Sequence, residues 1–405
     1  MSLFNYRVKL FVYTSLVLAT FLYTPINRPQ LPIEKVKKLV SKNLIESGEF
    51  KEQLDVAGKT YHVDFTVQKK YQEFLDKLLR RHYSDYAVAV VIDNDNGEVI
   101  GLGSYSLAEK RKVPELAFQT THPSASLIKI VSIANLIENS KLKNSSDIYF
   151  QGRGTTLYKY QLKDDRRWRR KMSLKKAFAF SNNPAIAKAT IKYSVANDFI
   201  KTANKFGFNK EFTNFVELPQ PKLPVPQNQY NFAEISSGFT TETLTNPIQA
   251  AYMPFLIANN GVGRKLKLIE KVVAPDGLLH QGLEDIDAAK PLFDETTVAQ
   301  LKHAMESVVE RGTASRLRRR LRRNVKKELT IGGKTGTLTG GEPYGRRDWF
   351  AGYAIPKDGS SKGISFAVMH INQKKWYVRS TFIAKNIIEY YYRQYKNDRE
   401  RIAYK

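Results

Sequence analysis

The order in which strand and helix patterns follow one another limits what this chain can fold into. Alternating apolar residues predict strands at 86–93 and 98–104, and "NDNG" between them predicts the turn of a hairpin. Helical spacing fills most of the chain from 124 to 310, and a last helix is predicted at 380–395. Strand patterns return between them at 328–337, 348–355 and 363–371. This order predicts an α+β fold, in which an antiparallel sheet is flanked by helices and joined to an all-helical subdomain.

Within the helical block, apolar residues recur at intervals of three and four, which is typical of amphipathic helices. The predicted helices lie at 124–138, 173–180, 184–193, 246–259 and 295–310. Ahead of the hairpin, "YHVDFTVQ" predicts one more strand, and the stretch 69–83 predicts one more helix. The strands and helices together are enough for one large mixed domain.

An uncharged stretch precedes the domain. Residues 10–26, "LFVYTSLVLATFLYTPI", reach the lower length limit for a helix that spans a bilayer. A cleaved signal peptide is the alternative, although no small-x-small cleavage site stands near the end of the stretch. We expect a short inner tail and one N-terminal transmembrane helix at 1–26, a linker at 27–60, the globular domain at 61–395 and a C-terminal tail at 396–405.

Composition narrows the possible chemistry. The 405 residues are 42% hydrophobic with 23 Gly and 16 Pro, which is ample for a packed core. The absence of cysteine excludes disulfides and cysteine nucleophiles, so covalent catalysis must fall to Ser, Thr, Lys or a carboxylate. The six histidines show no metal-ligand spacing, and no metal or other cofactor is implied. A net charge of +26 favours anionic partners such as membrane surfaces, nucleic acid or an envelope polymer.

A serine and a lysine three residues apart suggest nucleophilic catalysis. Ser126 and Lys129 share one face of a predicted helix, so the amine can reach the hydroxyl and accept its proton if the pKa of the lysine is lowered. The spacing alone is a weak signal, because it also occurs at 140–143 and 173–176, where a solvated helix face explains it. S-x-N likewise occurs twice, at 41–43 and 181–183, whereas K-T-G occurs once, at 334–336.

The ordered combination of these motifs is more specific. "SLIK" at the start of an apolar helix, "SNN" and then "KTGT" in a strand form the signature of serine acyl-transferases that react with penicillin. From about residue 60 to 395 the chain resembles the transpeptidase domain of penicillin-binding proteins, including "AVVIDNDNGEVIGLGS", "SSGFTTETLTNPIQ" and "DWFAGY". One departure is Asn246, because the family usually runs directly from threonine to proline there.

The resemblance implies a role for each polar residue of the motifs. Ser126 is expected to attack a D-Ala-D-Ala bond and become acylated, with Lys129 as the proton acceptor. Ser181 is expected to relay a proton to the leaving amine, and Asn183 to hold the amide of the substrate. Lys334 is expected to supply positive potential and to keep the proton network poised.

The strand that carries the lysine is expected to bind the substrate. Small glycines around Lys334 allow a peptide to lie close against the strand edge. The resemblance implies that the hydroxyls of Thr335 and Thr337, on either side of Gly336, bind the terminal carboxylate. It also implies that the backbone N–H groups of Ser126 and Thr337 face the oxyanion.

The resemblance favours a peptidoglycan D,D-transpeptidase that acts on stem peptides and takes β-lactams as covalent inhibitors. A D,D-carboxypeptidase or endopeptidase and a β-lactam sensor remain alternatives. A β-lactamase is disfavoured, because the one glutamate with an asparagine four residues on, Glu242 with Asn246, lies in the segment that resembles a T-P-L-Q helix. No glycosyltransferase domain fits ahead of residue 61, so a glycosyltransferase partner is possible. The substrate implies an extracytoplasmic domain on the cytoplasmic membrane.

Two basic runs, 163–176 and 316–327, are not explained by the motifs. In the run from Arg316 to Lys327, Leu317, Leu321 and Val325 recur every four residues, which as one helix gives an apolar stripe between cationic flanks. Contact with anionic lipid is one interpretation and a solvated insertion is the other. Nucleic acid is a rival partner, but an export segment and an acyl-transfer site argue against it.

Overall fold

The computed structural model describes residues 32–403 except 83, 165, 166, 168, 276, 278 and 281–289. The predicted tail and transmembrane helix at 1–26 therefore lie outside the described residues. No helix in the described part of the chain combines the length and the apolar character that crossing a membrane requires.

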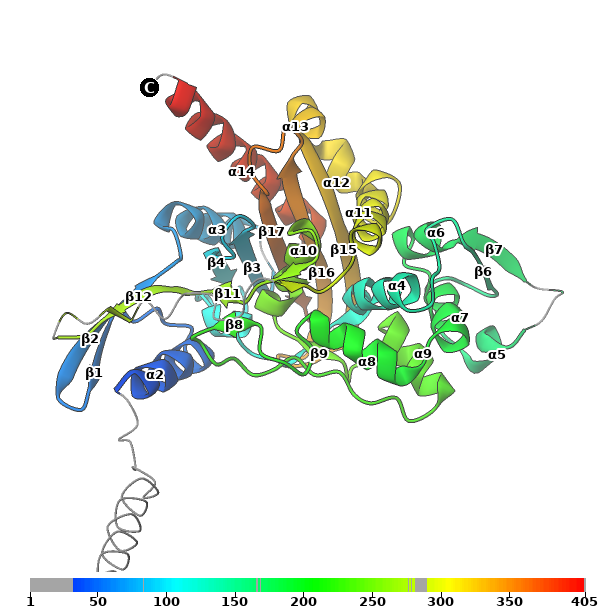
Figure 1. Cartoon of the computed structure of the whole chain (residues 1–405), viewed down its shortest axis with the longest axis horizontal. Helices are drawn as coiled ribbons and strands as arrows, with labels where there is room; N and C mark the ends of the chain where they lie inside the picture. Colours follow the sequence, from blue (N-terminus) through cyan, green and yellow to red (C-terminus); the bar gives the residue numbers. More distant parts are fainter. Residues whose placement is uncertain are drawn as a thin grey trace, which may run out of the picture.

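A five-stranded antiparallel sheet of order β15-β16-β17-β3-β4 forms the centre of the molecule (Figure 1). Its strands are β3 (Tyr86–Asp93), β4 (Val99–Tyr105), β15 (Leu329–Gly340), β16 (Gly345–Pro356) and β17 (Ile364–Asn372). The predicted hairpin is β3 and β4, and its partner β17 comes from the last third of the chain, with Ala89 opposite Val368. The strand with the K-T-G motif, β15, is an edge strand, so one of its sides is free to meet another group.

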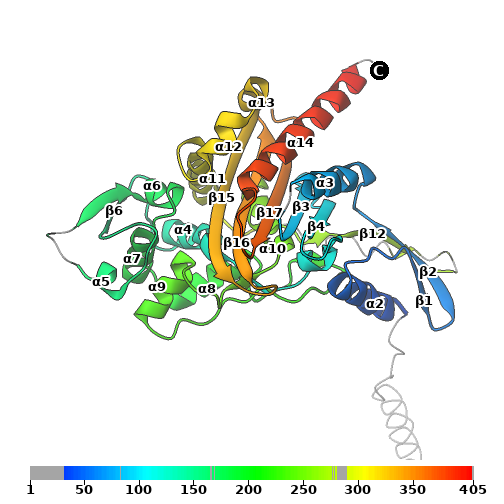
Figure 2. The same ribbon diagram turned by 180° about the vertical axis from the view of Figure 1, so that it is seen from behind.

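Helices cover both faces of the sheet, which explains why β3 and β17 are apolar along nearly their whole length. On one face lie α10 (Pro247–Ala258) and α11 (Glu295–Glu310), and on the other lie α3 (Lys69–Arg81) and α14 (Ser380–Ala403), as the front and back views show (Figures 1 and 2). The last helix continues to Ala403, so the domain boundary predicted at 395 falls inside it.

A further group of helices forms a subdomain beside the β15 edge (Figure 1). They are α4 (Lys129–Glu138), α5 (Lys159–Leu162), α6 (Leu174–Ala179), α7 (Asn183–Tyr193), α8 (Ala196–Lys205) and α9 (Gln229–Ser237). The subdomain is not all-helical as predicted, because β6 (Asp147–Phe150) pairs with β7 (Arg170–Ser173) within it. Strands of four residues are too short to show a clear alternating pattern, which is why they were not predicted.

Most of the predicted linker is packed against the domain. Residues 32–60 contain α2 (Pro32–Glu46) and β1 (Gln53–Val56), and Val36, Val40 and Leu44 are buried in the main core. β1 pairs with β2 (Lys59–Phe65), and β2 pairs with β12 (Ile269–Val273) from the other half of the chain.

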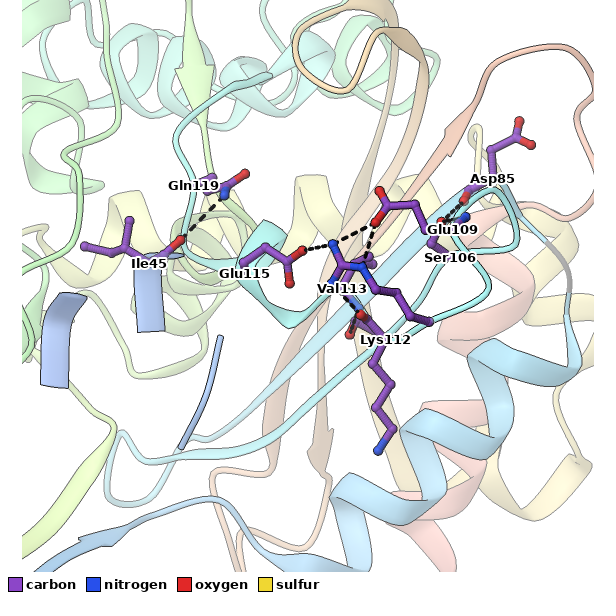
Figure 3. A network of polar contacts seen from close by, with 10 residues as sticks. Ile45, Asp85, Ser106, Glu109, Lys112, Val113, Glu115 and Gln119 are labelled. Carbon is purple, nitrogen blue, oxygen red and sulfur yellow. Dashed lines mark hydrogen bonds and ion pairs between the residues drawn. The ribbon is translucent and has the colours of Figure 1, made fainter. Parts of the chain in front are cut away.

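A polar network fixes the segment that follows β4 (Figure 3). Arg111 lies 2.7 Å from carboxylate oxygens of both Glu109 and Glu115, and Gln119 donates to the carbonyl of Ile45 at the end of α2. This segment leads directly into the turn that carries Ser126, so the network helps to hold that turn in place.

The prediction of one amphipathic helix at 316–327 is wrong. The run forms two short helices, α12 (Ser315–Arg320) and α13 (Arg323–Glu328), with two extended residues, Leu321 and Arg322, between them. Leu317, Leu321 and Val325 are 2%, 3% and 0% exposed, so they belong to the core and cannot enter a lipid surface. The basic side chains and Asn324 form the solvent-facing part of this run.

Candidate active site

A strained turn presents Ser126. It lies in a 3₁₀ helix, η2 (Ala125–Ile128), that leads into α4, and residues three apart on such a turn lie one above the other. Ala125 has a φ of 49°, a left-handed conformation that costs about 1 kcal/mol for a residue with a side chain. Gly238, at the end of α9, also has a positive φ, and a Cβ there would lie 2.0 Å from the carbonyl oxygen of Ala125. Only glycine fits, so α9 packs directly against the turn.

The amine of Lys129 lies at the centre of the site. Its side chain is fully buried, and its Nζ lies 2.7 Å from Ser126 Oγ and 3.3 Å from Ser181 Oγ. Two oxygens that can only accept hydrogen bonds complete the set, Asn183 Oδ1 at 2.6 Å and the carbonyl of Ser237 at 2.7 Å. Four polar groups from three segments of the chain therefore meet at one nitrogen.

These partners determine where a neutral amine directs its lone pair. A neutral lysine has two N–H bonds and one lone pair, and the oxygens of Asn183 and Ser237 take the two N–H bonds. The lone pair is then left for the hydroxyl of Ser126. Burial and, to a lesser extent, the charge of Lys334 lower the pKa of Lys129 well below its ordinary value. The site thus favours the protonation state that can accept a proton.

Ser181 joins the two lysines. It occupies a turn between α6 and α7 with a φ of 53°, and its Oγ lies 3.3 Å from Lys129 Nζ and 3.0 Å from Lys334 Nζ. The side chain of Asn182 caps α7 by accepting a hydrogen bond from the amide of Ala185. The cap fixes the start of α7 and with it the positions of Ser181 and Asn183.

Lys334 is held in the interior and is not an exposed strand lysine. It is fully buried, its ammonium lies 5.6 Å from the centre of the Phe178 ring, and it donates to the carbonyl of Thr335. Burial lowers its pKa to about 7. Near neutral pH this lysine can therefore be present in both protonation states.

The edge of β15 lies against the turn of the nucleophile. A Cβ placed on Gly336 would lie 3.4 Å from the amide nitrogen of Ser126, so the strand backbone comes close to the serine. Thr335 is half-buried and its hydroxyl lies 2.6 Å from that of Thr313, whereas Thr337 is exposed. The three distant motifs thus enclose one site, with all of the residues predicted from sequence in or beside it.

His122, close to Ser126 in sequence, is neither at the surface nor free to act as a base. It is fully buried, with Nε2 3.1 Å from the carbonyl of Leu116 and Nδ1 3.3 Å from the guanidinium of Arg347. Burial and the charge of Arg347 lower its pKa to about 3. Both ring nitrogens are occupied, which leaves Lys129 as the base within reach of Ser126.

The pair Glu242 and Asn246 has a structural explanation. Asn246 is fully buried and caps α10, since its Oδ1 accepts from the amide of Gln249 at 2.8 Å and its amide group donates to Thr120. Glu242 is exposed. The asparagine that departs from the resembled pattern therefore starts a helix and does not form a pair with Glu242.

Three contacts of the site could not be predicted from the motifs. They are the carbonyl of Ser237, the hydroxyl of Thr313 and the ring of Phe178. Each depends on how distant elements pack. The one local signal was the "SG" at 237–238, which marks the left-handed end of α9.

Comparisons with known proteins agree with this arrangement. The family model of the penicillin-binding protein transpeptidase domain matches residues 87–389. Stage V sporulation protein D of Bacillus subtilis (strain 168) is 23% identical over 290 residues, which cover 68% of this chain and 43% of that protein. The chain thus spans less than half the length of this curated relative.

Solved structures share the fold at low sequence identity. Penicillin-binding protein 3 of Mycobacterium tuberculosis, complexed with aztreonam, is similar with a TM-score of 0.66 and 18% identity over 83% of this chain and 80% of that chain. The D,D-transpeptidase domain of a peptidoglycan glycosyltransferase from Eggerthella lenta gives a TM-score of 0.62 and 17% identity over 86% and 85%. At these identities the likeness shows the fold alone.

Proposed function

Because the chain belongs to the family of penicillin-binding protein transpeptidase domains, we propose that it is a peptidoglycan D,D-transpeptidase that cross-links stem peptides through an ester on Ser126. The observation that carries the proposal is the set of contacts around Lys129 Nζ. Two acceptors bind its N–H groups, and its remaining position lies 2.7 Å from the serine hydroxyl. Such a pair is the arrangement that activates a serine without histidine.

In the acylation step Ser126 Oγ attacks the carbonyl carbon of the penultimate D-Ala while Lys129 takes the hydroxyl proton. The C–N bond to the terminal D-Ala then breaks, and a proton reaches the leaving amine through the hydroxyl of Ser181. The distances of 3.3 Å and 3.0 Å from Ser181 Oγ to the two lysines support this relay. The product is an ester on Ser126 and free D-alanine.

Substrate binding falls to the edge of β15. The terminal carboxylate is bound by the hydroxyls of Thr335 and Thr337 in the positive potential of Lys334, with Gly336 leaving room for the peptide. Asn183 holds the amide of the substrate through its –NH₂ group, since its carbonyl oxygen is occupied by Lys129. The backbone N–H groups of Ser126 and Thr337 bind the oxyanion, and each such donor contributes about 3 kcal/mol of transition-state stabilisation.

The second step transfers the acyl group to an amine of a neighbouring stem peptide. That amine attacks the ester carbon, loses its proton to the lysine network, and returns Ser126 to its hydroxyl form. The cap role of Asn246 argues against a Glu–Asn pair that activates water, which favours the amine as acceptor. β-Lactams acylate Ser126 in the first step and stay attached. Residues 10–26 anchor the domain on the extracytoplasmic side of the cytoplasmic membrane, where this substrate occurs.

The proposal is tested with a donor peptide that ends in D-Ala-D-Ala and an isotope-labelled amine acceptor. We expect mass spectrometry to find release of one D-alanine for each cross-linked product in the wild type, and neither product in Ser126→Ala. Release of D-alanine with only the hydrolysed peptide as the second product would identify a carboxypeptidase. Products from Ser126→Ala at the wild-type rate would remove Ser126 from the mechanism.

A further inference from the structure

A cationic cavity lies apart from the acyl-transfer site. It encloses about 510 Å³ between the end of α3, helix α12 and the start of α14. In the back view α14 lies between α12 and α3, and it contacts both (Figure 2). No residue of the S-x-x-K, S-x-N or K-T-G motifs lines it.

Five basic side chains from three segments of the chain line this cavity. They are Arg81, Arg316, Arg320, Arg379 and Lys385. The described lining contains no acidic residue. α14 is 24 residues long and its first turn forms part of the wall, so the positive end of the helix dipole adds to the field.

Two carboxylates on or next to α14 have partners of their own. Glu389 lies 2.6 Å from Lys385 Nζ, and Asp348 accepts a hydrogen bond from the amide of Ser380 at 2.7 Å. Arg379 interacts electrostatically with Asp348, whereas Arg81, Arg316 and Arg320 form no ion pair with a described carboxylate. These three guanidinium groups around one cavity repel each other, and a bound anion would relieve that repulsion.

A second basic cavity provides a comparison within the same chain. It encloses about 380 Å³ and is lined by Lys201, Lys205 and Lys265, among others. Each of these lysines has a carboxylate partner, at distances of 3.7, 2.7 and 3.7 Å respectively. One of these carboxylates, Glu211, is itself part of the lining of that cavity, whereas the described lining of the cavity at α12 contains no acidic residue.

We propose that the cavity between α3, α12 and α14 binds a phosphate group, either of a lipid headgroup or of a free phosphate ester. Arginine presents a planar fork of N–H donors that binds phosphate oxygens in pairs, and a tetrahedral dianion can satisfy several forks at once. The volume exceeds that of a phosphate ion, so there is room for an ester group. Its carbon atoms would pack on Leu317 and Phe382, which form part of the lining.

The test uses the full chain in detergent and isothermal titration calorimetry at constant ionic strength. The probes are inorganic phosphate and a water-soluble short-chain phosphatidylglycerol. We expect saturable binding at one site and a loss of at least about a hundredfold in affinity in Arg316→Gln/Arg320→Gln/Arg379→Gln, because each charged hydrogen bond contributes tenfold or more. Phosphatidylglycerol binding tenfold tighter than phosphate identifies the lipid headgroup as the source, and comparable affinities identify a free phosphate ester.

A matched control removes the same number of charges elsewhere. Lys201→Gln/Lys265→Gln/Lys290→Gln alters the second basic cavity, and we expect its affinity to stay within about threefold of the wild type. Because Arg320 and Arg379 also stack on aromatic rings, the single variant Arg316→Gln, which removes no such contact, should lose about tenfold. Equal losses in the two triple variants, or no saturable binding of either probe by the wild type, would overturn the proposal.

Discussion

The side chains of Lys129 and Lys334 are fully buried. By contrast, those of Arg319, Arg322 and Arg323 in the basic run are exposed to solvent. Both groups of side chains carry a positive formal charge, but the lysines are buried and the arginines are exposed. Burial lowers the pKa of both lysines, whereas an arginine side chain in a protein has no neutral form with which to accept a proton. Environment, not the number of charges, therefore decides which basic residues of this chain can take part in proton transfer.

The largest effect is expected from replacing one of the two buried lysines. Lys129→Arg keeps the positive charge but removes the base, because arginine does not lose its proton in proteins. We expect the rate of acylation by a fluorescent penicillin to fall by about 10²–10⁴. Lys143→Arg, in the exposed S-x-x-K at 140–143, is the control and should react as the wild type does. Normal acylation of Lys129→Arg would refute the role of the amine.

The apolar residues of the basic run provide the second test. If Leu321 belongs to the core, Leu321→Ala should lower the free energy of unfolding by about 2–4 kcal/mol in urea titrations. Val225→Ala, at a valine that is 62% exposed, should change it by less than about 0.5 kcal/mol. An effect of Leu321→Ala as small as that of the control would mean that the stripe faces outward.

The pH dependence separates the two buried lysines. Lys129 must be neutral to accept a proton, so kcat/KM for a peptide donor should rise with pH through its lowered pKa. Lys334 must be charged to attract the carboxylate, so kcat/KM should fall as pH rises through its pKa of about 7. Lys334→Arg should move this alkaline fall upward by more than about one pH unit, since arginine stays charged. If kcat/KM of Lys334→Arg fell at the same pH as in the wild type, loss of the Lys334 proton would not be the cause of the fall.

The smallest effect is expected from replacing the exposed arginines of the basic run. Arg319→Gln/Arg322→Gln/Arg323→Gln removes three solvent-facing charges from the basic run, and penicillin acylation should stay within about twofold of the wild type. If the acylation rate fell tenfold or more, the positive charge of the basic run would be acting on the active site from a distance. The contrast between buried cations that take part in the reaction and exposed cations that do not would then be wrong.

Sequence patterns predicted the sheet and the site residues better than the details around them. The β3–β4 hairpin, the K-T-G strand and the long helices α3, α4, α7, α10, α11 and α14 follow from clear periodicity. The motif order brought Ser126, Ser181 and Lys334 to one site. The β6–β7 pair was missed because its strands are short. The prediction of one helix for the basic run was wrong because apolar residues four positions apart are compatible with two structures. One is a single amphipathic helix, and the other is a pair of short helices that each bury an apolar residue.

The contacts that give the site its chemistry depend on tertiary packing. The carbonyl of Ser237 and the hydroxyl of Thr313 belong to segments with no catalytic motif, yet they fix the orientation of Lys129 and Thr335. The sequence could predict that a lysine stands three residues after a serine. It could not predict the oxygens that direct the lone pair of that lysine toward the serine hydroxyl.

The central claim is that Ser126 is the nucleophile, and mapping the penicillin adduct tests it most directly. The full chain is treated with benzylpenicillin, digested, and analysed by mass spectrometry beside Ser126→Ala and Ser140→Ala. We predict one adduct with the mass of the intact antibiotic, on the peptide that contains Ser126, present in the wild type and Ser140→Ala and absent from Ser126→Ala. An adduct on any other peptide, or one that persists in Ser126→Ala, would contradict the account.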